Sequence, residues 1–489
     1  MNRNKKKVIV VGGGTAALTI SNRLSSKFDV RLMERSAIKN LPLFYQIPLF
    51  IGYLFKKNND FVSTYEIDGP YNRKLPFFES RVFGGASFIN GTVHAVGSRW
   101  LWRKILNKYN FTWSELQSSY NYIFGNLIKL RKKKADHLDM IFANTLEKMG
   151  IPKCSVEFAE NTGVGPIINT AGKIFRSSVR DLGNPININL DSNVKHILID
   201  EKKIVGVECN GISYYADYVI LSSGVLGSNA LIKNGFKDIK TQDVVFPNLP
   251  DMGWISDHTN LRINVKVKSA VESLNQLSTQ RIRKIALFIK HCLGFSTLLA
   301  GTGATSAAHL DLDGDGHVDV RIQLLRFYES GRAGSTGNFF DSDVPGFSIS
   351  ITVINPKSTG SIKGAGTQTQ PDPRYLSNPS DFEPLKKALR FIIGMLQSEA
   401  FSKIIDEIID VDEIINDPEN FIKKNIYSGY HLIGGLSEFV DEDFKVKDFE
   451  NLYICDASVI SSHPSSNIHA PVVLLSDVFA KRFAADFLP

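Results

Sequence analysis

A glycine-rich turn near the start of the chain constrains the fold more than any other feature of the sequence. Residues 12–17 fit the pattern G-x-G-x-x-G/A, and an apolar run at residues 8–11 stands directly before them. A segment typical of a helix follows, through Leu24, and then a second apolar run at residues 30–33. This order predicts a βαβ unit within an α/β domain built on a Rossmann-like, doubly wound sheet.

Each small residue of this turn has a mechanical task. Gly12 permits the tight turn, Gly14 lets the backbone approach a pyrophosphate, and Ala17 lets the helix pack closely on the strand. The helix begins at Thr15 and Ala16, where free backbone N–H groups offer a partial positive charge to phosphates. The turn therefore predicts a dinucleotide site.

Glu34 narrows the type of dinucleotide. It ends the second predicted strand, where a carboxylate can accept hydrogen bonds from ribose hydroxyls. A carboxylate there disfavours a 2′-phosphate, so NADP is not expected. FAD and NAD both remain open on this motif alone.

The composition is that of an ordinary globular protein. The 489 residues leave room for about two or three domains. Apolar residues make up 43% and charged residues 22%, which excludes a disordered, collagen-like or coiled-coil chain. The net charge of +7 comes from 57 basic residues interspersed with 50 acidic ones, so nucleic-acid binding is not expected.

The cysteines and the N-terminal segment bear on the compartment. Four cysteines are scattered without a C-x-x-C pair, which excludes a disulfide scaffold and fits a reducing compartment. A basic start followed by the apolar residues 8–20 superficially resembles a signal peptide, but the glycines at 12–14 interrupt it and no convincing cleavage site follows. We therefore expect a cytoplasmic protein. No apolar run is long enough to predict a membrane-spanning helix.

Further short patterns follow along the chain. They read GGASFING at 84–91, YVILSSGVLGS at 218–228, YHLIG at 430–434, NLYICDAS at 451–458 and PSSNIHAP at 464–471. In this order they resemble the signatures of the glucose–methanol–choline (GMC) oxidoreductases, a family of flavoproteins, and the similarity spans almost the whole chain. The resemblance implies FAD as the cofactor.

The resemblance also assigns residues to the cofactor. It places Ser87 and Asn90 at the pyrophosphate and flavin ring, Val194 at the adenine side and Asp456 near the ribityl chain. His469 would touch flavin or substrate. The expected cofactor-binding residues are Gly12, Gly14, Thr15, Ala16, Glu34, Gly85, Ser87, Asn90, Gly91, Val194, Asp456, Ala457 and His469. No metal site is expected.

Two residues carry the implied chemistry. The family's base matches His431, and histidine suits that role because its ordinary pKa of about 6.5 leaves it largely neutral near pH 7. The partner position is Asn467, which cannot titrate and is expected to orient the substrate oxygen. The implied reaction oxidises the CH–OH group of an alcohol or sugar, with hydride transfer to flavin N5. Oxygen, a quinone or a carrier protein could then accept the electrons.

Two departures from the family pattern keep alternatives open. Asn229 replaces a proline and Gly435 a threonine, and the second signature is slightly short. A flavoprotein of this fold could instead have lyase or light-driven decarboxylase chemistry, or bind flavin without catalysis. The light-driven relatives have a cysteine where His431 stands, which argues against that variant.

The resemblance also predicts the domain organisation. An FAD-binding domain would comprise residues 1–40, 80–251 and 425–489. Residues 41–79 would cover the flavin or line the substrate entrance, and residues 252–424 would form an α+β substrate domain on an antiparallel sheet. His463 is expected to be structural or to lie at the pocket rim. His94 follows the first signature, and nothing at its spacing requires the covalent histidine–flavin bond known in some relatives.

Within the predicted substrate domain, two segments have an alternative interpretation. Residues 307–312 and 317–324 predict a β-hairpin around an acidic loop. The loop resembles a calcium loop, but Ile322 stands where a bidentate glutamate is needed, so a tight acidic turn is favoured. Residues 281–299 mix basic and apolar side chains; a packed domain helix is favoured over a helix that contacts a membrane surface. The basic run at 129–134 is interpreted as a solvated helix face.

Overall fold

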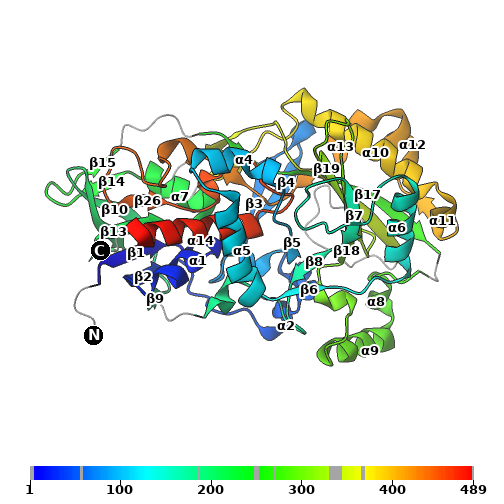
Figure 1. Ribbon diagram of the computed structural model, residues 1–489, viewed down its shortest axis with the longest axis horizontal. Helices are drawn as coiled ribbons and strands as arrows, with labels where there is room; N and C mark the ends of the chain where they lie inside the picture. Colours follow the sequence, from blue (N-terminus) through cyan, green and yellow to red (C-terminus); the bar gives the residue numbers. More distant parts are fainter. Residues whose placement is uncertain are drawn as a thin grey trace.

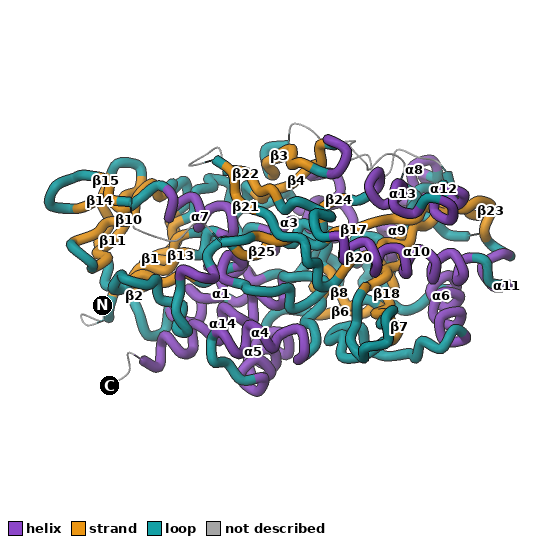
Figure 2. Tube along the Cα trace, turned by 90° about the horizontal axis from the view of Figure 1, so that it is seen from above, coloured by secondary structure: helices purple, strands orange, loops and turns teal. Residues whose placement is uncertain are grey.

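The computed structural model describes residues 5–55, 59–183, 187–246, 253–268, 271–329, 344–364 and 369–486. The domain boundary expected between residues 251 and 252 lies outside these ranges. The molecule is elongated, with a parallel sheet toward one end and a larger antiparallel sheet toward the other (Figures 1 and 2). The mixed α/β architecture expected from the sequence is confirmed.

The predicted βαβ unit forms the centre of a five-stranded parallel sheet. It consists of β1 (Lys7–Val11), α1 (Thr15–Leu24) and β2 (Asp29–Met33). The strand order is β26-β13-β1-β2-β9, completed by β26 (Leu452–Ile454), β13 (Tyr218–Leu221) and β9 (Asn187–Asn189). The central strands are almost wholly apolar because both faces of a parallel sheet are covered.

Helices from distant parts of the chain cover this sheet. The C-terminal helix α14 (His469–Asp486) packs against α1 and against α5 (Trp113–Asn126), as Figure 1 shows. Helix α7 (Gly224–Lys233) follows β13, and α4 (Arg99–Lys108) precedes α5. A second five-stranded sheet lies at the same end of the molecule, with the strand order β12 (Ile212–Tyr215), β11 (Lys203–Cys209), β10 (Val194–Asp200), β14 (Phe236–Asp238) and β15 (Val244–Val245).

A seven-stranded antiparallel sheet dominates the other end. Its strands, in order, are β23 (Ile405–Ile408), β17 (Thr259–Val267), β20 (Gly346–Val353), β19 (Val320–Leu325), β18 (Ala304–Leu310) and β7 (Gly163–Pro166), and β24 (Tyr427–Ser428) pairs with β17. Helix α10 (Phe382–Leu396) packs on β19 and β20, and α6 (His137–Lys148) packs on β18 and β7.

Strand β17 shows how this sheet faces in two directions. Its residues alternate between buried and half-buried. Leu261, Ile263 and Val265 point into the apolar core, whereas Asn260 and Arg262 line a large cavity on the opposite face. The period of two along a strand thus separates the core side of the sheet from the functional side.

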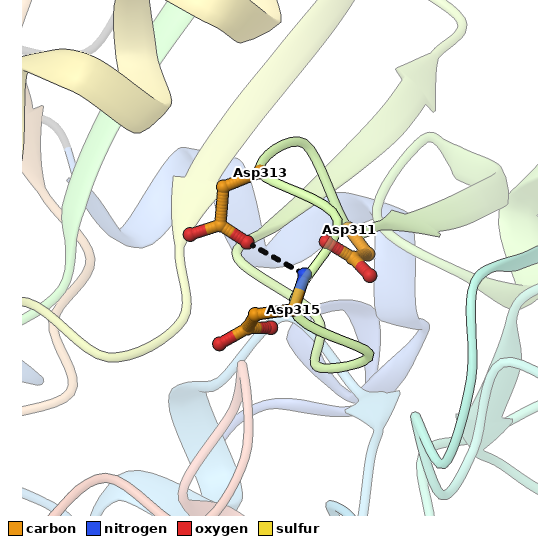
Figure 3. A group of neighbouring side chains, drawn as sticks. All are labelled: Asp311, Asp313 and Asp315. Carbon is orange, nitrogen blue, oxygen red and sulfur yellow. Dashed lines mark hydrogen bonds between the residues drawn. The ribbon is translucent and has the colours of Figure 1, made fainter.

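The predicted hairpin is confirmed as β18 and β19, joined by the acidic loop. The carboxylates of Asp311, Asp313 and Asp315 lie within 4.8 Å of one another (Figure 3). Asp311 accepts N–H bonds from Gly314 and Gly316 at 2.7 and 2.8 Å, and Asp313 accepts one from Asp315 at 3.2 Å. The aspartates therefore stabilise a tight turn, the interpretation favoured from the sequence.

Several short elements lie between the two main sheets. They are α2 (Leu43–Gln46), η1 (Pro48–Phe55), the hairpin of β3 (Val62–Asp68) and β4 (Lys74–Ser80), and α3 (Ala86–Ile89). Leu49, Ile51 and Phe55 of η1, with Phe77 and Phe78 of β4, line the cavity. Among the described residues, no helix has the length and apolar character needed to cross a membrane.

Candidate active site

A cavity of about 880 Å³ runs from the β1–α1 turn to the inner face of the antiparallel sheet. This volume is at the upper end of the range for ligand sites, about 300–1,000 Å³. All of the predicted site residues but one line it. They are Gly12, Gly14, Thr15, Ala16, Glu34, Gly85, Asn90, Gly91, Val194, Asp456, Ala457, His469, His431 and Asn467.

The exception is Ser87. Its side chain is buried, and its hydroxyl donates to the backbone carbonyl of Gly84 at 2.6 Å. The residue therefore holds the turn before α3 and lies outside the cavity lining. His94 also lies outside: its Nε2 is 2.9 Å from the Glu157 carboxylate, in a buried contact behind the site.

Two glycine turns form the end of the cavity where the sequence predicts phosphate binding, called the phosphate end below. Gly12 has φ of +113°, and a Cβ there would lie 2.5 Å from the Ser222 carbonyl oxygen. Gly85 has φ of +56°, and its Cβ would lie 2.8 Å from the Cα of Gly14. The two turns thus pack backbone to backbone, which only glycine allows. By contrast, a Cβ on Gly14 would meet no atom nearer than 4.0 Å, so the space in front of it is open.

Helix α1 points its N-terminus at this open space. Its N-cap is Gly14, and no side chain caps the first turn. The leading N–H groups of a helix need acceptors, and a phosphate can supply them. At the end of β2, Glu34 accepts the Ser36 N–H at 2.7 Å, and burial raises the pKa of its carboxyl group.

Asp456 joins two further turns at the cavity wall. Its Oδ2 accepts the Gly224 N–H at 2.9 Å and the Ser228 hydroxyl at 2.6 Å, and its Oδ1 accepts the Ser458 N–H at 2.7 Å. One buried carboxylate therefore ties the turn after β13 to the turn after β26. Burial raises the pKa of Asp456, and these donors oppose the rise.

His469, at the start of α14, is buried and lines the cavity. Burial lowers its pKa to about 3, so the ring is neutral. Its Nε2 has no hydrogen-bond partner within the described part of the protein. A buried polar atom without a partner at a cavity wall is the kind of group that a bound ligand satisfies.

The other end of the cavity holds a chain of hydrogen-bonded side chains around His431. Its Nε2 lies 3.0 Å from the Asn467 amide nitrogen, and its Nδ1 lies 2.9 Å from Nδ1 of His258. The Nε2 of His258 lies 3.0 Å from the Ile354 carbonyl oxygen. Sequence reasoning found His431 and Asn467 but missed His258.

These contacts fix the tautomers. The Ile354 carbonyl can only accept, so His258 carries its hydrogen on Nε2 and its Nδ1 is an acceptor. The hydrogen between the two rings therefore belongs to Nδ1 of His431. Consequently Nε2 of His431 is unprotonated, and its lone pair is directed toward Asn467. This is the form that a general base requires.

Burial keeps both rings neutral. It lowers the pKa of His258 to about 4. Burial, followed by the nearby His258 and Arg321, lowers the pKa of His431 well below its usual value. His463 lies behind His258, with ring centroids 3.9 Å apart, and is buried outside the cavity lining.

Asp257 holds the backbone of His431 in place. Its Oδ1 accepts the His431 N–H at 2.7 Å, and its Oδ2 accepts the Ser428 and Tyr375 hydroxyls at 2.6 and 2.5 Å. Tyr430, directly before His431, has φ of +59°, which is unusual for a residue with a side chain. The carboxylate therefore stabilises a strained turn that presents His431 to the cavity.

Arg321 of β19 is the most unexpected member of the site. Its guanidinium is buried, and Nη1 donates to the Ser466 hydroxyl at 3.0 Å and to Asn467 Oδ1 at 2.5 Å. Among the residues the structure describes, no carboxylate forms an ion pair with it. Burial lowers the pKa of Arg321 to about 10, so it remains a cation near neutral pH. Its contact with Oδ1 orients the Asn467 amide so that the nitrogen faces His431.

The two departures from the family pattern contact each other. A Cβ on Gly435 would lie 2.6 Å from Nδ2 of Asn229, and Gly435 has φ of +100°. The Asn229 amide also donates to the Val225 carbonyl at 2.6 Å. Neither residue lines the cavity. Asn229 therefore occupies the space that a side chain at position 435 would need, behind the site.

With this geometry described, known proteins provide a comparison. The GMC oxidoreductase family model matches residues 356–476. An oxygen-dependent choline dehydrogenase from Vibrio vulnificus (strain YJ016) is 23% identical over 527 residues, covering 96% of this chain and 92% of that protein. A formate oxidase variant from Aspergillus oryzae RIB40, studied for FAD modification, has a TM-score of 0.84 at 16% identity, covering 100% of this chain and 99% of the other. Pyridoxine 4-oxidase from Mesorbium loti has a TM-score of 0.81 at 18% identity, covering 98% and 99%.

These matches confirm the resemblance carried by the sequence motifs. The chain resembles the GMC oxidoreductases over almost its whole length, the family model matches residues 356–476, and FAD is the cofactor that these similarities indicate. The residues present fit FAD, because the cavity offers an open cradle at Gly14, an uncapped helix N-terminus, and an unpartnered nitrogen on His469.

Proposed function

We propose that the protein oxidises the CH–OH group of a small polar alcohol or sugar, with FAD accepting the hydride at N5. The observation that carries this proposal is the unprotonated Nε2 of His431, which lines the cavity. A substrate hydroxyl that replaces the Asn467 N–H at that lone pair can give up its proton to Nε2. The three relatives described above are named for acting on choline, formate and pyridoxine.

Asn467 and Arg321 complete the proposed chemistry. The Asn467 amide has two N–H donors, and one of them lies toward His431. The other is free to orient a substrate oxygen. As that oxygen loses its proton it gains negative charge, which the buried Arg321 cation stabilises through the polarised amide. Arg321 also disfavours protonation of His431 before substrate binds.

The inner face of the antiparallel sheet supports a polar substrate. Its polar side chains that line the cavity, beside Leu325, are Asn260, Arg262, Arg321, Gln323, Ser350, Thr352 and Tyr427. Such a surface provides hydrogen-bond partners to several hydroxyl or carboxylate groups at once. The aromatic side chains of Phe77, Phe78 and Tyr430 also line the cavity, where they would help to exclude water from the reacting centre.

The alternative chemistries have less support. A light-driven decarboxylase would be expected to have cysteine at position 431. The hypothesis that the chain binds flavin without catalysis is based largely on Asn229 and Gly435, and both residues lie outside the cavity lining. Lyase chemistry needs the same base and differs in leaving the flavin oxidised at the end of the reaction.

The test is the visible spectrum of the purified protein without oxygen, recorded before and after addition of primary alcohols, sugars and hydroxy acids. Bleaching of the flavin band by one class of compound is expected, and return of the band in air would identify oxygen as the acceptor. A flavin band that none of these compounds bleaches contradicts the proposal. Product formed while the band stays oxidised would favour lyase chemistry.

A further inference from the structure

Helix α9 (Arg281–Cys292) presents most of its large apolar side chains to solvent. Ile282, Ile285, Phe288 and Ile289 are between 41% and 85% exposed, and Leu293, in the turn that follows, is 71% exposed. The sequence favoured a packed domain helix here, and that expectation is wrong for this face. Figure 1 shows α9 projecting from the edge of the molecule.

The opposite side of α9 anchors it to the protein. Leu287 packs against an apolar cluster, and the buried His291 bonds to the Ile174 carbonyl at 2.8 Å and the Thr297 hydroxyl at 3.0 Å. At 3.6 residues per turn, these anchors lie roughly opposite the row formed by Ile282, Ile289 and Leu293. The apolar row therefore points away from the body of the protein.

Basic side chains flank this row, and acidic ones are missing. Arg283, Lys284 and Lys290 are exposed on α9. No aspartate or glutamate occurs in the sequence between Glu272 and Asp311. A solvent-facing apolar row with only positive charge beside it is typical of helices that lie in the interface of an anionic membrane.

The densest basic run of the sequence lies against the end of this helix. Residues 130–132 form strand β6 rather than the helix face expected from the sequence. Arg131 donates to the carbonyls of Gly294 and Phe295 at 3.2 and 2.9 Å, and the Lys134 N–H donates to the Ser296 hydroxyl at 3.1 Å. Lys132 and Lys134 are exposed beside the helix. Two basic segments far apart in the sequence thus form one positive surface.

The surface continues toward the cavity wall. Helix α9 contacts the short turn Leu298–Ala300, which packs on η1, and η1 lines the cavity. Just before η1, Leu43 and Phe44 of α2 are 66% and 47% exposed, and Phe44 stacks on Phe50 at a centroid distance of 4.1 Å. An exposed apolar strip therefore borders the covering segment of the active site.

We propose that this face, formed by α9, α2 and the basic segment 129–134, docks the protein on the surface of an anionic lipid bilayer. The apolar row would enter the boundary between headgroups and acyl chains, while the flanking cations contact anionic headgroups. A second copy of the chain is a poorer occupant, because a two-fold interface would place this positive surface against itself. The inference stands independently of the substrate.

The FAD-loaded protein is mixed with vesicles of phosphatidylcholine and phosphatidylglycerol in equal parts, and the bound fraction is measured by sedimentation. The wild type is expected to co-sediment, more weakly as salt rises and weakly with phosphatidylcholine alone. The double variants Ile285→Glu/Ile289→Glu and Arg283→Glu/Lys284→Glu are each expected to lower the vesicle affinity about tenfold or more.

Matched controls come from the opposite end of the molecule. Ile212→Glu replaces an apolar residue that is 58% exposed, and Lys202→Glu reverses an exposed charge; both should bind vesicles like the wild type. All variants should keep their FAD spectrum, because every substituted side chain is exposed. Absence of vesicle binding by the wild type, or equal binding by the α9 variants and the controls, overturns the proposal. So does a wild-type dimer, detected by sedimentation velocity, that Ile285→Glu/Ile289→Glu dissociates.

Discussion

The two ends of the active-site cavity are built in different ways. The phosphate end is made mainly of backbone: two glycine turns in contact and an uncapped helix, with the Asp456 carboxylate joining two adjacent turns. The reacting end is made of side chains from β19, the turn before β17 and two segments near the C-terminus, connected through His258, His431, Asn467 and Arg321. The first end is shaped by its backbone to receive the cofactor, and the second sets the protonation states of His258 and His431.

This difference predicts two separable kinds of failure. Damage to the backbone end should release FAD, whereas damage to the side-chain end should leave FAD bound and slow its reduction by substrate.

Gly12→Ala should abolish FAD binding. Its Cβ would lie 2.5 Å from a backbone oxygen, at a φ that disfavours any side chain. The strain is worth about 1–3 kcal/mol and displaces the turn that receives the phosphates. The ratio of flavin to protein absorbance measures the loss. Gly211→Ala is the control, because Gly211 also has positive φ but its Cβ would meet no atom within 4 Å. A Gly12→Ala protein with a full complement of FAD contradicts the prediction.

Two buried aspartates provide a matched pair. Asp456→Asn should weaken FAD binding, because the amide cannot accept all the donors that tie the two cradle turns. Asp257→Asn should keep FAD but slow flavin reduction about tenfold to a hundredfold, since losing an acceptor at a buried site costs about 1–3 kcal/mol and frees the turn that presents His431. Flavin content and stopped-flow reduction are measured on both. If both variants lose FAD equally, the two ends are not separable.

The pH dependence tests the role of Arg321. A base works when deprotonated, so the rate of flavin reduction falls as pH drops through its pKa. Burial, His258 and Arg321 place the pKa of His431 well below 6.5, so the wild type should keep its reduction rate down to about pH 6. Arg321→Met removes the positive charge of Arg321, which lowers the pKa of His431, and should therefore move the loss of rate to higher pH. Arg321→Lys keeps the charge and should not. Identical acid limbs for Met and Lys variants would contradict this role.

Stability in acid offers a smaller test. The pKa values of His258, His309 and His469 are about 4, about 3 and about 3 in the folded protein, mainly because of burial. The unfolded chain, with pKa values near 6.5, then binds more protons below that pH. These histidines should therefore leave the free energy of unfolding undiminished above about pH 6.5 and lower it as the pH drops toward 4. His309→Leu should reduce the slope by about 1.4 kcal/mol per pH unit, measured by urea unfolding, with the exposed His137→Leu as control; equal slopes would count against buried neutral histidines.

The same contrast explains what the sequence could reveal. Gly12, Gly14 and Glu34 lie in one short βαβ unit, so their spacing alone predicts a cradle. His258, in the turn before β17, and Arg321, in β19, meet His431 only through the pairing of a seven-stranded sheet, and no local pattern reports such pairing. The available signal for Arg321 was the polar residues at alternating positions of β19, and no strand pattern marked His258.

The error about α9 has a related cause. An amphipathic pattern shows that a helix has an apolar side, but not whether protein covers that side. Here Leu287 and His291 anchor the helix, and the longer apolar row remains exposed.

By contrast, the hairpin around Asp311 was recognisable because its turn chemistry is local. Ser87 was assigned to the cofactor by resemblance, yet its hydroxyl is bonded within its own turn.

The central claim is that His431, unprotonated on Nε2, takes the proton of the substrate hydroxyl. Its most direct test is anaerobic stopped-flow reduction of bound FAD by an alcohol that bleaches the wild type, repeated with His431→Ala. The account predicts that the variant binds FAD fully, that its reduction slows by about a hundredfold to ten-thousandfold, and that added imidazole restores part of the rate. A variant that reduces its flavin as fast as the wild type would contradict the assignment of the base.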